Sequence, residues 1–225
     1  MAEWTDPMSE DDRKQAVVDL LAVLALAELS AFERLAADAS LAPSLVDKAA
    51  LGAMAAAEFG HYQVLHERLA ALGVDSTVAM APFVDPLNAF HDSTSPSDWL
   101  ESLVKAYVGD GFAADFYREI AEFADDETQA LVGDVLDDTG HAEFAVAHVR
   151  SAIEADPAVA GRLALWARRL VGEALVQAQR VAVDRDALTR LIVGGAGDPA
   201  AIGALLDRLT QRHSERMESL GLSSS

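Results

Sequence analysis

The sequence predicts an all-α protein built on a four-helix bundle, with one long crossover between the second and third helices. Three observations support this fold class. Hydrophobic residues make up 51% of the 225 residues and aromatic residues only 6%, a composition typical of packed helices. Capping side chains and prolines mark the starts of long helical segments. Finally, a carboxylate three positions before a histidine occurs twice, once in each half of the predicted bundle.

Start and stop signals divide the chain into six helices and one short helical piece. Ser9 and Ser44 each precede an acidic residue at the third following position, as in a capping box. Asp125 or Asp126 can cap a further start, and Gly73 marks a stop. Dipeptides of a capping residue and a proline are Ser95-Pro96, Asp156-Pro157 and Asp198-Pro199. The predicted helices span about 10–39, 44–72, 96–124, 126–155, 157–183 and 199–219, with a short piece near 185–193.

The lengths of the links predict how these helices are connected. The first and second helices, and likewise the third and fourth, are joined by short links, so each pair should be antiparallel. The link 73–95 contains Pro82 and Pro86 and is long enough to run the length of a bundle. We therefore expect residues 1–155 to form the bundle and 156–225 to form C-terminal helices that pack on it within the same domain.

Charge is distributed unevenly over the two parts. The chain has a formal net charge of −20. Residues 1–149 hold 28 acidic and 7 basic residues, whereas 150–225 hold 9 acidic and 10 basic residues. The acidic bundle should repel nucleic acid and attract cations. A polyanionic partner would have to approach the C-terminal part, which contains Arg162, Arg168, Arg169, Arg180, Arg185 and Arg190.

Several functional classes are excluded or disfavoured by composition. The chain has no cysteine, so disulfides, thiolate metal sites and iron–sulfur clusters are excluded. The first twelve residues are acidic, unlike a signal peptide. The apolar stretch 16–32 is interrupted by Asp19 and Glu28, which predicts a buried helix and not a membrane span. We expect a cytoplasmic protein with no membrane partner.

The two carboxylate–histidine pairs lie in Glu58-Phe59-Gly60-His61 and Asp138-Thr139-Gly140-His141. Helical positions three apart share a face, so each pair can direct an oxygen and a nitrogen at one metal ion. Each segment also follows an acid on another predicted helix, Glu28 before the first and Asp110 before the second. A single such pair carries little weight, but the agreement of both pairs with upstream acids predicts a carboxylate-bridged two-metal site.

The positions of these acids explain why metal ions are expected. In each of the four helices the acid takes a position where the 3–4 spacing calls for an apolar residue. Four buried carboxylates would be strongly destabilising unless two divalent cations neutralised them. Carboxylate and imidazole ligands suit iron, with manganese as the alternative. On the third helix Asp115 and Glu119 are possible substitutes for Asp110, although a role as a solvated or salt-bridging acid is preferred for Asp115. A metal-free bundle whose acids pair with the histidines or lie at the surface is the competing interpretation.

These residues resemble the ferritin-like di-iron carboxylate proteins over about 10–155. Within that superfamily, the two histidine segments and Tyr107-Val108-Gly109-Asp110-Gly111-Phe112 resemble the tRNA hydroxylase-like branch, named for an enzyme that hydroxylates the isopentenyl chain of a modified adenosine in tRNA. The resemblance implies that two iron ions are bound by Glu28, Glu58, His61, Asp110, Asp138 and His141. Aspartate at positions 110 and 138 departs from the usual glutamate, and the acidic bundle departs from a tRNA-binding surface.

The resemblance implies an oxygen-activating di-iron oxidoreductase, a hydroxylase or monooxygenase. Its partners would be dioxygen, an external electron donor, and either a small hydrophobic substrate or a modified tRNA, the latter disfavoured by charge. No residues are expected to be catalytic beyond the metal ligands. The alternatives are a ferroxidase or iron-binding protein and a metal-free interaction module. A homodimer through the C-terminal helices is compatible with the sequence but not indicated by it.

Overall fold

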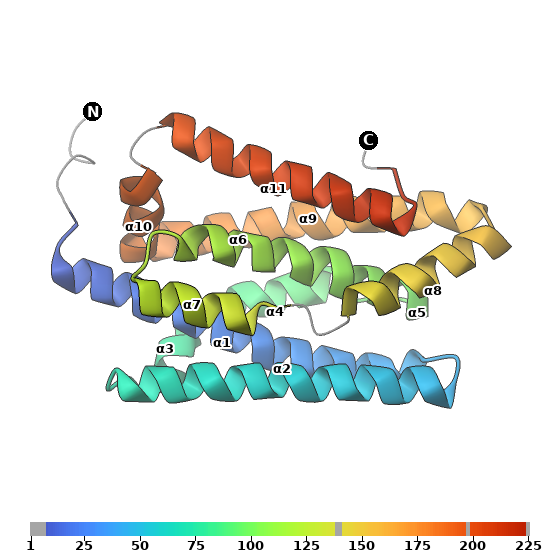
Figure 1. Cartoon of the computed structure of the whole chain (residues 1–225), viewed down its shortest axis with the longest axis horizontal. Coiled ribbons are helices and arrows are strands. Elements are labelled where there is room, and N and C mark those ends of the chain that lie inside the picture. The colour runs from blue at the N-terminus through green and yellow to red at the C-terminus, as the bar shows by residue number, and fades with distance from the viewer. Residues whose placement is uncertain (1–7, 138–140, 197–198, 224–225) are drawn as a thin grey trace.

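The computed structural model describes residues 8–137, 141–196 and 199–223, and within these ranges it is helical with no strands (Figure 1). The first hairpin consists of α1 (Glu10–Asp38) and α2 (Leu45–Ala71), joined by the 3-10 turn η1 (Ala39–Leu41). Its predicted signals are confirmed. The hydroxyl oxygens of Ser9 and Ser44 accept hydrogen bonds of 3.1 Å from the backbone N–H groups of Asp12 and Asp47. Gly73 ends α2 with a φ of +76°.

The crossover is present, but it is more helical than the sequence indicated. It contains α3 (Ser76–Met80), the 3-10 turn η2 (Ala81–Phe83) and α4 (Val84–Ser93). Pro82 and Pro86 both lie in the first turn of their elements, where a missing N–H costs nothing. Phe83 is 1% exposed and anchors the crossover in the core.

The third helix of the bundle has three parts: α5 (Trp99–Val104), the π-helical segment η3 (Lys105–Asp110) and α6 (Gly111–Ala121). The predicted start at 96 is three residues too early, because Asp98 and not Ser95 caps the helix by accepting a 2.9 Å hydrogen bond from the N–H of Glu101. π-helical turns are rare and often occur at functional sites. This one ends at Asp110, one of the predicted metal ligands.

The fourth helix was expected to be continuous over 126–155, and this is wrong. α7 (Asp126–Val135) ends in a turn at Leu136 and Asp137, and α8 begins at His141 and runs to Ala155. The guanidinium of Arg118 on α6 donates a hydrogen bond to the backbone carbonyl of Leu136 and so satisfies a helix-end acceptor. The segment from Asp137 to Gly140 is rich in residues with low helix propensity.

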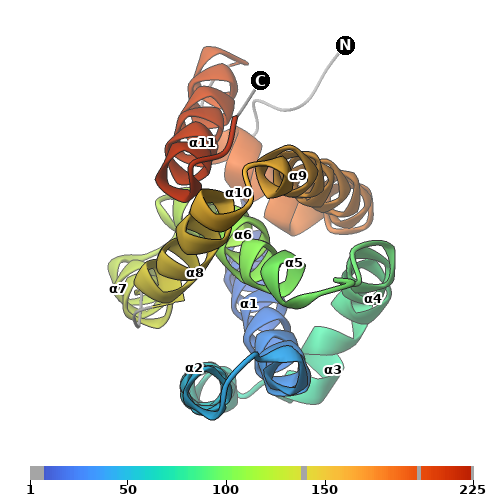
Figure 2. The same ribbon diagram turned by 90° about the vertical axis from the view of Figure 1, so that its right-hand side faces the viewer.

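The three C-terminal helices are α9 (Ala158–Asp184), α10 (Asp186–Ala196) and α11 (Pro199–Leu220). Two of them, α9 and α11, cover the third helix on the side away from the first hairpin, whereas α10 packs against α1 (Figure 2). The indole N–H of Trp166 on α9 donates a 2.9 Å hydrogen bond to the carbonyl of Glu101 on α5. The segment α5–η3–α6 is therefore enclosed between α1 and the C-terminal layer.

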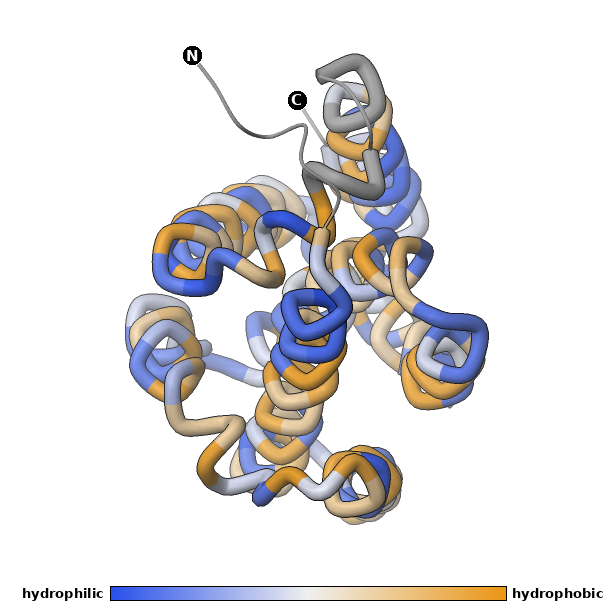
Figure 3. The backbone as a smooth tube through the Cα atoms, turned by 90° about the vertical axis from the view of Figure 1, so that its left-hand side faces the viewer, coloured by the Kyte–Doolittle hydropathy of each residue, from blue (hydrophilic) through white to orange (hydrophobic). Residues whose placement is uncertain are grey.

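Within the described ranges, the stretch Glu10–Leu41 is long and apolar enough to cross a membrane by length and composition alone. In this fold the same stretch packs inside the bundle. A view from the end of the bundle shows that α1 is hydrophobic over much of its length after hydrophilic first turns (Figure 3). The carboxylate of Asp19 on this helix is buried and paired with Arg185.

Candidate metal centre

The buried core of the bundle is divided into two apolar clusters along its length. On α1 the first cluster ends at Ala25 and the second begins at Leu35. On the antiparallel α2 the second cluster ends at Ala55 and the first begins at Leu65. Both helices thus have a gap between clusters at the same level of the bundle.

The predicted ligands lie in this gap. Glu28 is on α1, and Glu58 and His61 are on α2, between the limits just given. On the third helix Asp110 falls between Val108 of the second cluster and Tyr117 of the first. The apolar residues on both sides hold the four helices in fixed register, so that the polar side chains between them are brought together.

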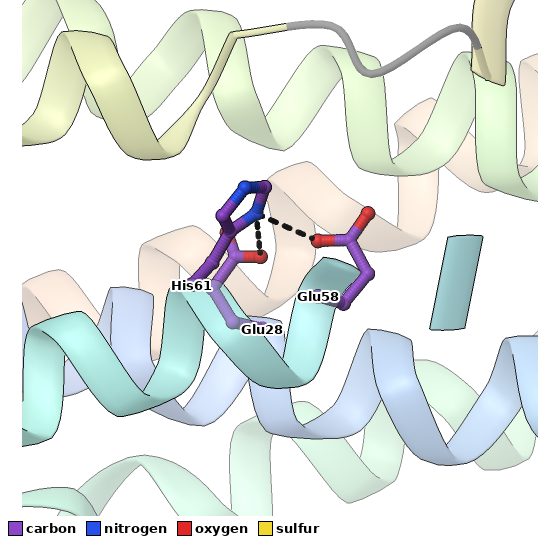
Figure 4. Close-up of side chains that lie close together, drawn as sticks. All are labelled: Glu28, Glu58 and His61. Carbon is purple, nitrogen blue, oxygen red and sulfur yellow. Dashed lines mark hydrogen bonds and ion pairs between the residues drawn. The ribbon is translucent and has the colours of Figure 1, made fainter. Parts of the chain in front are cut away.

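Three of the predicted ligands converge directly (Figure 4). The Nδ1 atom of His61 lies 3.4 Å from a carboxylate oxygen of Glu28 and 3.3 Å from one of Glu58. One ligand atom from each of these residues lies within 4.8 Å of the other two. Glu28 is only 6% exposed, so this is a carboxylate in the interior of the protein. Their spacing is compatible with one ion that is bound by all three.

Glu58 also reaches the fourth helix. Its second carboxylate oxygen lies 3.2 Å from Nδ1 of His141, at the start of α8. One carboxylate therefore contacts two imidazoles that are far apart in sequence. This is the arrangement expected of a carboxylate that bridges two metal ions.

Asp110 and Asp138 complete the predicted set. Asp110 lines the same pocket of about 240 Å³ as Glu28, Glu58, His61 and His141. Asp138 lies outside the described residues. Asp138 and His141 were expected to share one face of a helix because they are three positions apart. The described α8 begins only at His141, so no described helix contains both residues. The structure therefore brings five of the six predicted ligands to one pocket.

The two substitutes named for Asp110 have other roles. The Asp115 carboxylate pairs with the guanidinium of Arg216, and Glu119 pairs with Arg208 and, at 3.1 Å, with Arg212. Both acids are almost fully buried between α6 and α11. The salt-bridging interpretation of Asp115 is thus confirmed, and neither acid is directed at the pocket.

The protonation of the cluster follows from burial and from these contacts. Burial raises the pKa of Glu28 to about 8, although the hydrogen bond with His61 opposes the shift. Hydrogen bonds to Glu28 and then to Glu58 raise the pKa of His61 to about 10. Burial alone would raise the pKa of Glu58, but the hydrogen bonds from His61 and Glu28 hold it below its ordinary value. Asp110 was expected to be buried, but it is exposed in the pocket; the protein atoms around its carboxyl group raise its pKa to about 7.

The converging donors Glu28, Glu58 and His61 fit one divalent metal ion. His141 and Asp110 line the same pocket but, among the described residues, do not form a second group of three donors as close as these. Hard carboxylate oxygens combined with imidazole nitrogens suit iron or manganese. Without ions the cluster must keep protons on Glu28 and His61, because like charges cannot accumulate in the interior.

Comparison with known families decides the fold assignment. Residues 11–195 match the family described as a ferritin-like domain of actinomycetes. The chain belongs to this family. The matched region includes all six predicted ligands and the whole of α9. No curated protein matches the sequence.

Some residues of the pocket of this ferritin-like protein were missed by sequence reasoning. Tyr117 and two arginines, Arg118 and Arg216, line it together with the predicted ligands. Arg216 lies against α6 at Gly111, where an added Cβ would come within 2.6 Å of the Arg216 Nε atom. Arg216 had no local signal, because α11 is brought to α6 only by the tertiary fold, whereas Arg118 lies on α6 itself.

The pKa shifts predict how the stability of the metal-free protein depends on pH. His61 is protonated in the folded state up to about pH 10, so the stabilisation from its ion pairs is present below 6.5 and is lost as the pH rises through 10. Glu28 resists ionisation up to about pH 8, so its burial cost grows above 4.5, where the unfolded chain ionises. Both effects have the same sign.

We therefore expect the thermal unfolding midpoint of the metal-free protein to decrease as the pH is raised from 6 to 9. Carboxylates with lowered pKa values, such as Glu58, change the stability with pH only at lower pH. They therefore do not alter the trend between pH 6 and pH 9. The measurement is a series of melting curves in the presence of a chelator. Glu28→Gln should flatten the dependence, and a midpoint that rises with pH would contradict this account.

Proposed function

We propose that this ferritin-like protein is an oxygen-activating di-iron hydroxylase, related in its chemistry to the tRNA-modifying hydroxylases. The observation that carries the proposal is the position of Glu58, whose two oxygens contact His61 and His141 on different helices. A bridging carboxylate with one imidazole on each side is the ligand pattern of di-iron carboxylate proteins. The iron ions, when bound, would supply the activation of dioxygen.

The overall reaction balances with an external reductant. One oxygen atom of dioxygen is inserted into a C–H bond of the substrate, and the other leaves as water after taking up two protons and two electrons. The electrons must come from a separate redox protein, since the sequence contains no flavin or nicotinamide motif. We expect this exchange to occur in the cytoplasm.

The chain's own residues bind, orient and exclude water. Glu28 and Glu58 hold the ions at a fixed level of the bundle, and the apolar clusters on both sides keep bulk water away. Arg118 and Arg216 place positive charge at the same pocket. Guanidinium groups at the pocket oppose a continuous flow of metal cations, which favours a resident cofactor over iron storage.

Iron stoichiometry separates this proposal from its alternatives. The protein is purified from iron-supplemented cells, its iron content is measured, and Fe(II) is then added stepwise to the metal-free protein in the presence of dioxygen. A hydroxylase should stop consuming oxygen once two iron ions per chain are oxidised, and should be a small particle by light scattering. Continued oxidation with large assemblies would indicate a ferroxidase instead, and absence of iron binding would indicate a metal-free module.

The histidines provide the matched variants. His61→Ala and His141→Ala should each lose iron, as measured by elemental analysis, because each removes one imidazole donor. Helical content by circular dichroism should change little, since the apolar clusters are untouched. Exposed His66→Ala, on the same helix as His61, should retain its iron. If either ligand variant still held two irons per chain, the ligand assignment would be wrong.

A further inference from the structure

A second cavity of about 160 Å³ adjoins the candidate metal centre. It lies between α1, α4, the η3–α6 segment, α9 and α10. Five residues line both this cavity and the metal pocket, namely Ala27, Ala31, Asp110, Ala113 and Tyr117. Three of the five are alanines, so little side-chain volume separates the two spaces. The cavity therefore ends at the candidate metal centre.

The rest of the lining is mostly apolar. It includes Leu87 and Phe90 of α4, Phe116 of α6, and Ala178 and Val181 of α9. Protein interiors are close-packed, and an unfilled apolar cavity costs stability. A dry apolar cavity of about 150 Å³ accepts one benzene-sized molecule. The size and lining of this cavity therefore match a ring-sized apolar ligand.

His91 supplies a polar contact in this lining. It lies on α4, and the residue is 7% exposed. Its Nδ1 atom is buried and has no hydrogen-bond partner in the part of the chain that the structure describes. Burial and the nearby Lys105 and Arg34 lower the pKa of His91 to about 3, so the ring is neutral. An unpaired buried nitrogen costs free energy, which a ligand hydrogen bond would recover once a small rotation of the His91 ring turns Nδ1 toward the cavity.

We infer that this cavity is the substrate pocket, and that it takes a ring-sized apolar molecule with one hydroxyl or similar polar group held by His91. The far end of such a molecule lies toward Asp110 and the metal centre. The role of the ligand as substrate rests on the proposed function, whereas its binding does not. The cavity is partly open, at exposed residues of α9 such as Leu175, but its small volume favours a small free molecule over a macromolecule.

The test uses phenol and toluene, which have the same ring size and differ in the hydroxyl group. Binding to the full chain is measured by ligand-observed NMR titration, once with the metal-free protein and once after loading with iron. We expect phenol to bind at least about tenfold more tightly than toluene, because only phenol can satisfy His91. Equal affinity, or no binding of either probe, would overturn the inference.

Two variants locate the binding. His91→Phe keeps an aromatic ring and should weaken phenol binding about tenfold while leaving toluene binding within about twofold. Ala178→Phe fills the cavity and should weaken both probes at least about tenfold. The control Ala158→Phe makes the same exchange at an exposed position of α9 and should change neither. Unchanged phenol binding in both cavity variants, each folded by circular dichroism, would overturn the assignment.

Phenol binding and iron binding distinguish a failure of the pocket assignment from a failure of the hydroxylase proposal. If phenol binds and responds to His91→Phe but the protein holds no iron, the pocket stands and the hydroxylase proposal fails. If iron binds with the expected ligand dependence but neither probe binds, the metal centre stands and the pocket assignment fails.

Discussion

Glu58→Ala should reduce bound iron from two ions per chain to nearly none. Glu58 contacts both histidines through separate oxygens, so its loss removes a donor from each metal position and the link between them. Loss of any other single ligand removes a donor from one position only. Metal binding depends steeply on the number and geometry of donors, and a residue shared by two ions should therefore have the largest effect. Elemental analysis of the purified variant is the measurement.

The control for this variant is Glu67→Ala, which removes an exposed glutamate from the same helix. Its iron content should equal that of the unmodified protein. Glu58→Ala should still fold, because the residues that hold α1 against α2 belong to the two apolar clusters. Iron retained at two ions per chain in a folded Glu58→Ala protein would contradict the bridging role.

Asp115→Ala should lower the free energy of unfolding by about 3 kcal/mol, the scale measured when one partner of a buried ion pair is removed. Asp115 is 4% exposed, and it pairs with Arg216, with Arg118 at 3.7 Å and with Arg212 at 3.8 Å. Its removal leaves the largely buried guanidinium of Arg216 without this carboxylate and weakens the attachment of α11 to α6. Urea unfolding followed by circular dichroism is the measurement.

Asp134→Ala is the matched control, since this aspartate lies on α7 and is exposed. Its free energy of unfolding should stay within about 0.5 kcal/mol of that of the unmodified protein. Iron content of Asp115→Ala at low temperature should be retained, because Asp115 is not directed at the pocket. A loss of iron without a loss of stability would instead return Asp115 to the ligand set.

The first hairpin was predictable because its signals are local. Ser9 and Ser44 cap the helix starts, and Gly73 supplies the positive φ at the end of α2. The apolar spacing on α1 and α2 then fixes which residues face inward. Glu28 and Glu58 interrupt that spacing, so their burial beside His61 could be anticipated from sequence alone.

The third and fourth helices were less predictable because tertiary contacts shape them. The π-helical turn before Asp110 packs against α9, and Arg118 caps the end of α7 through the Leu136 carbonyl. Neither contact has a signature in the neighbouring sequence. The interruption before His141 did have a local signal, the low helix propensity of Asp137 to Gly140, but the spacing of Asp138 and His141 was interpreted as helical.

His91 was missed because the crossover was read as a link. His91 lines a cavity between helices that are distant in sequence, including α4 and α9, so its role could not be predicted from its neighbours in the chain. Prolines that usually indicate breaks stand here in first turns, which hid the helix that carries His91.

Anomalous diffraction at the iron edge, from crystals of the iron-loaded protein, tests the central claim most directly. The account predicts two peaks, one between Glu28, Glu58 and His61, and one between Glu58, His141 and Asp110. A map without such peaks, with the carboxylates of Glu28 and Glu58 still in direct contact with His61, would contradict it.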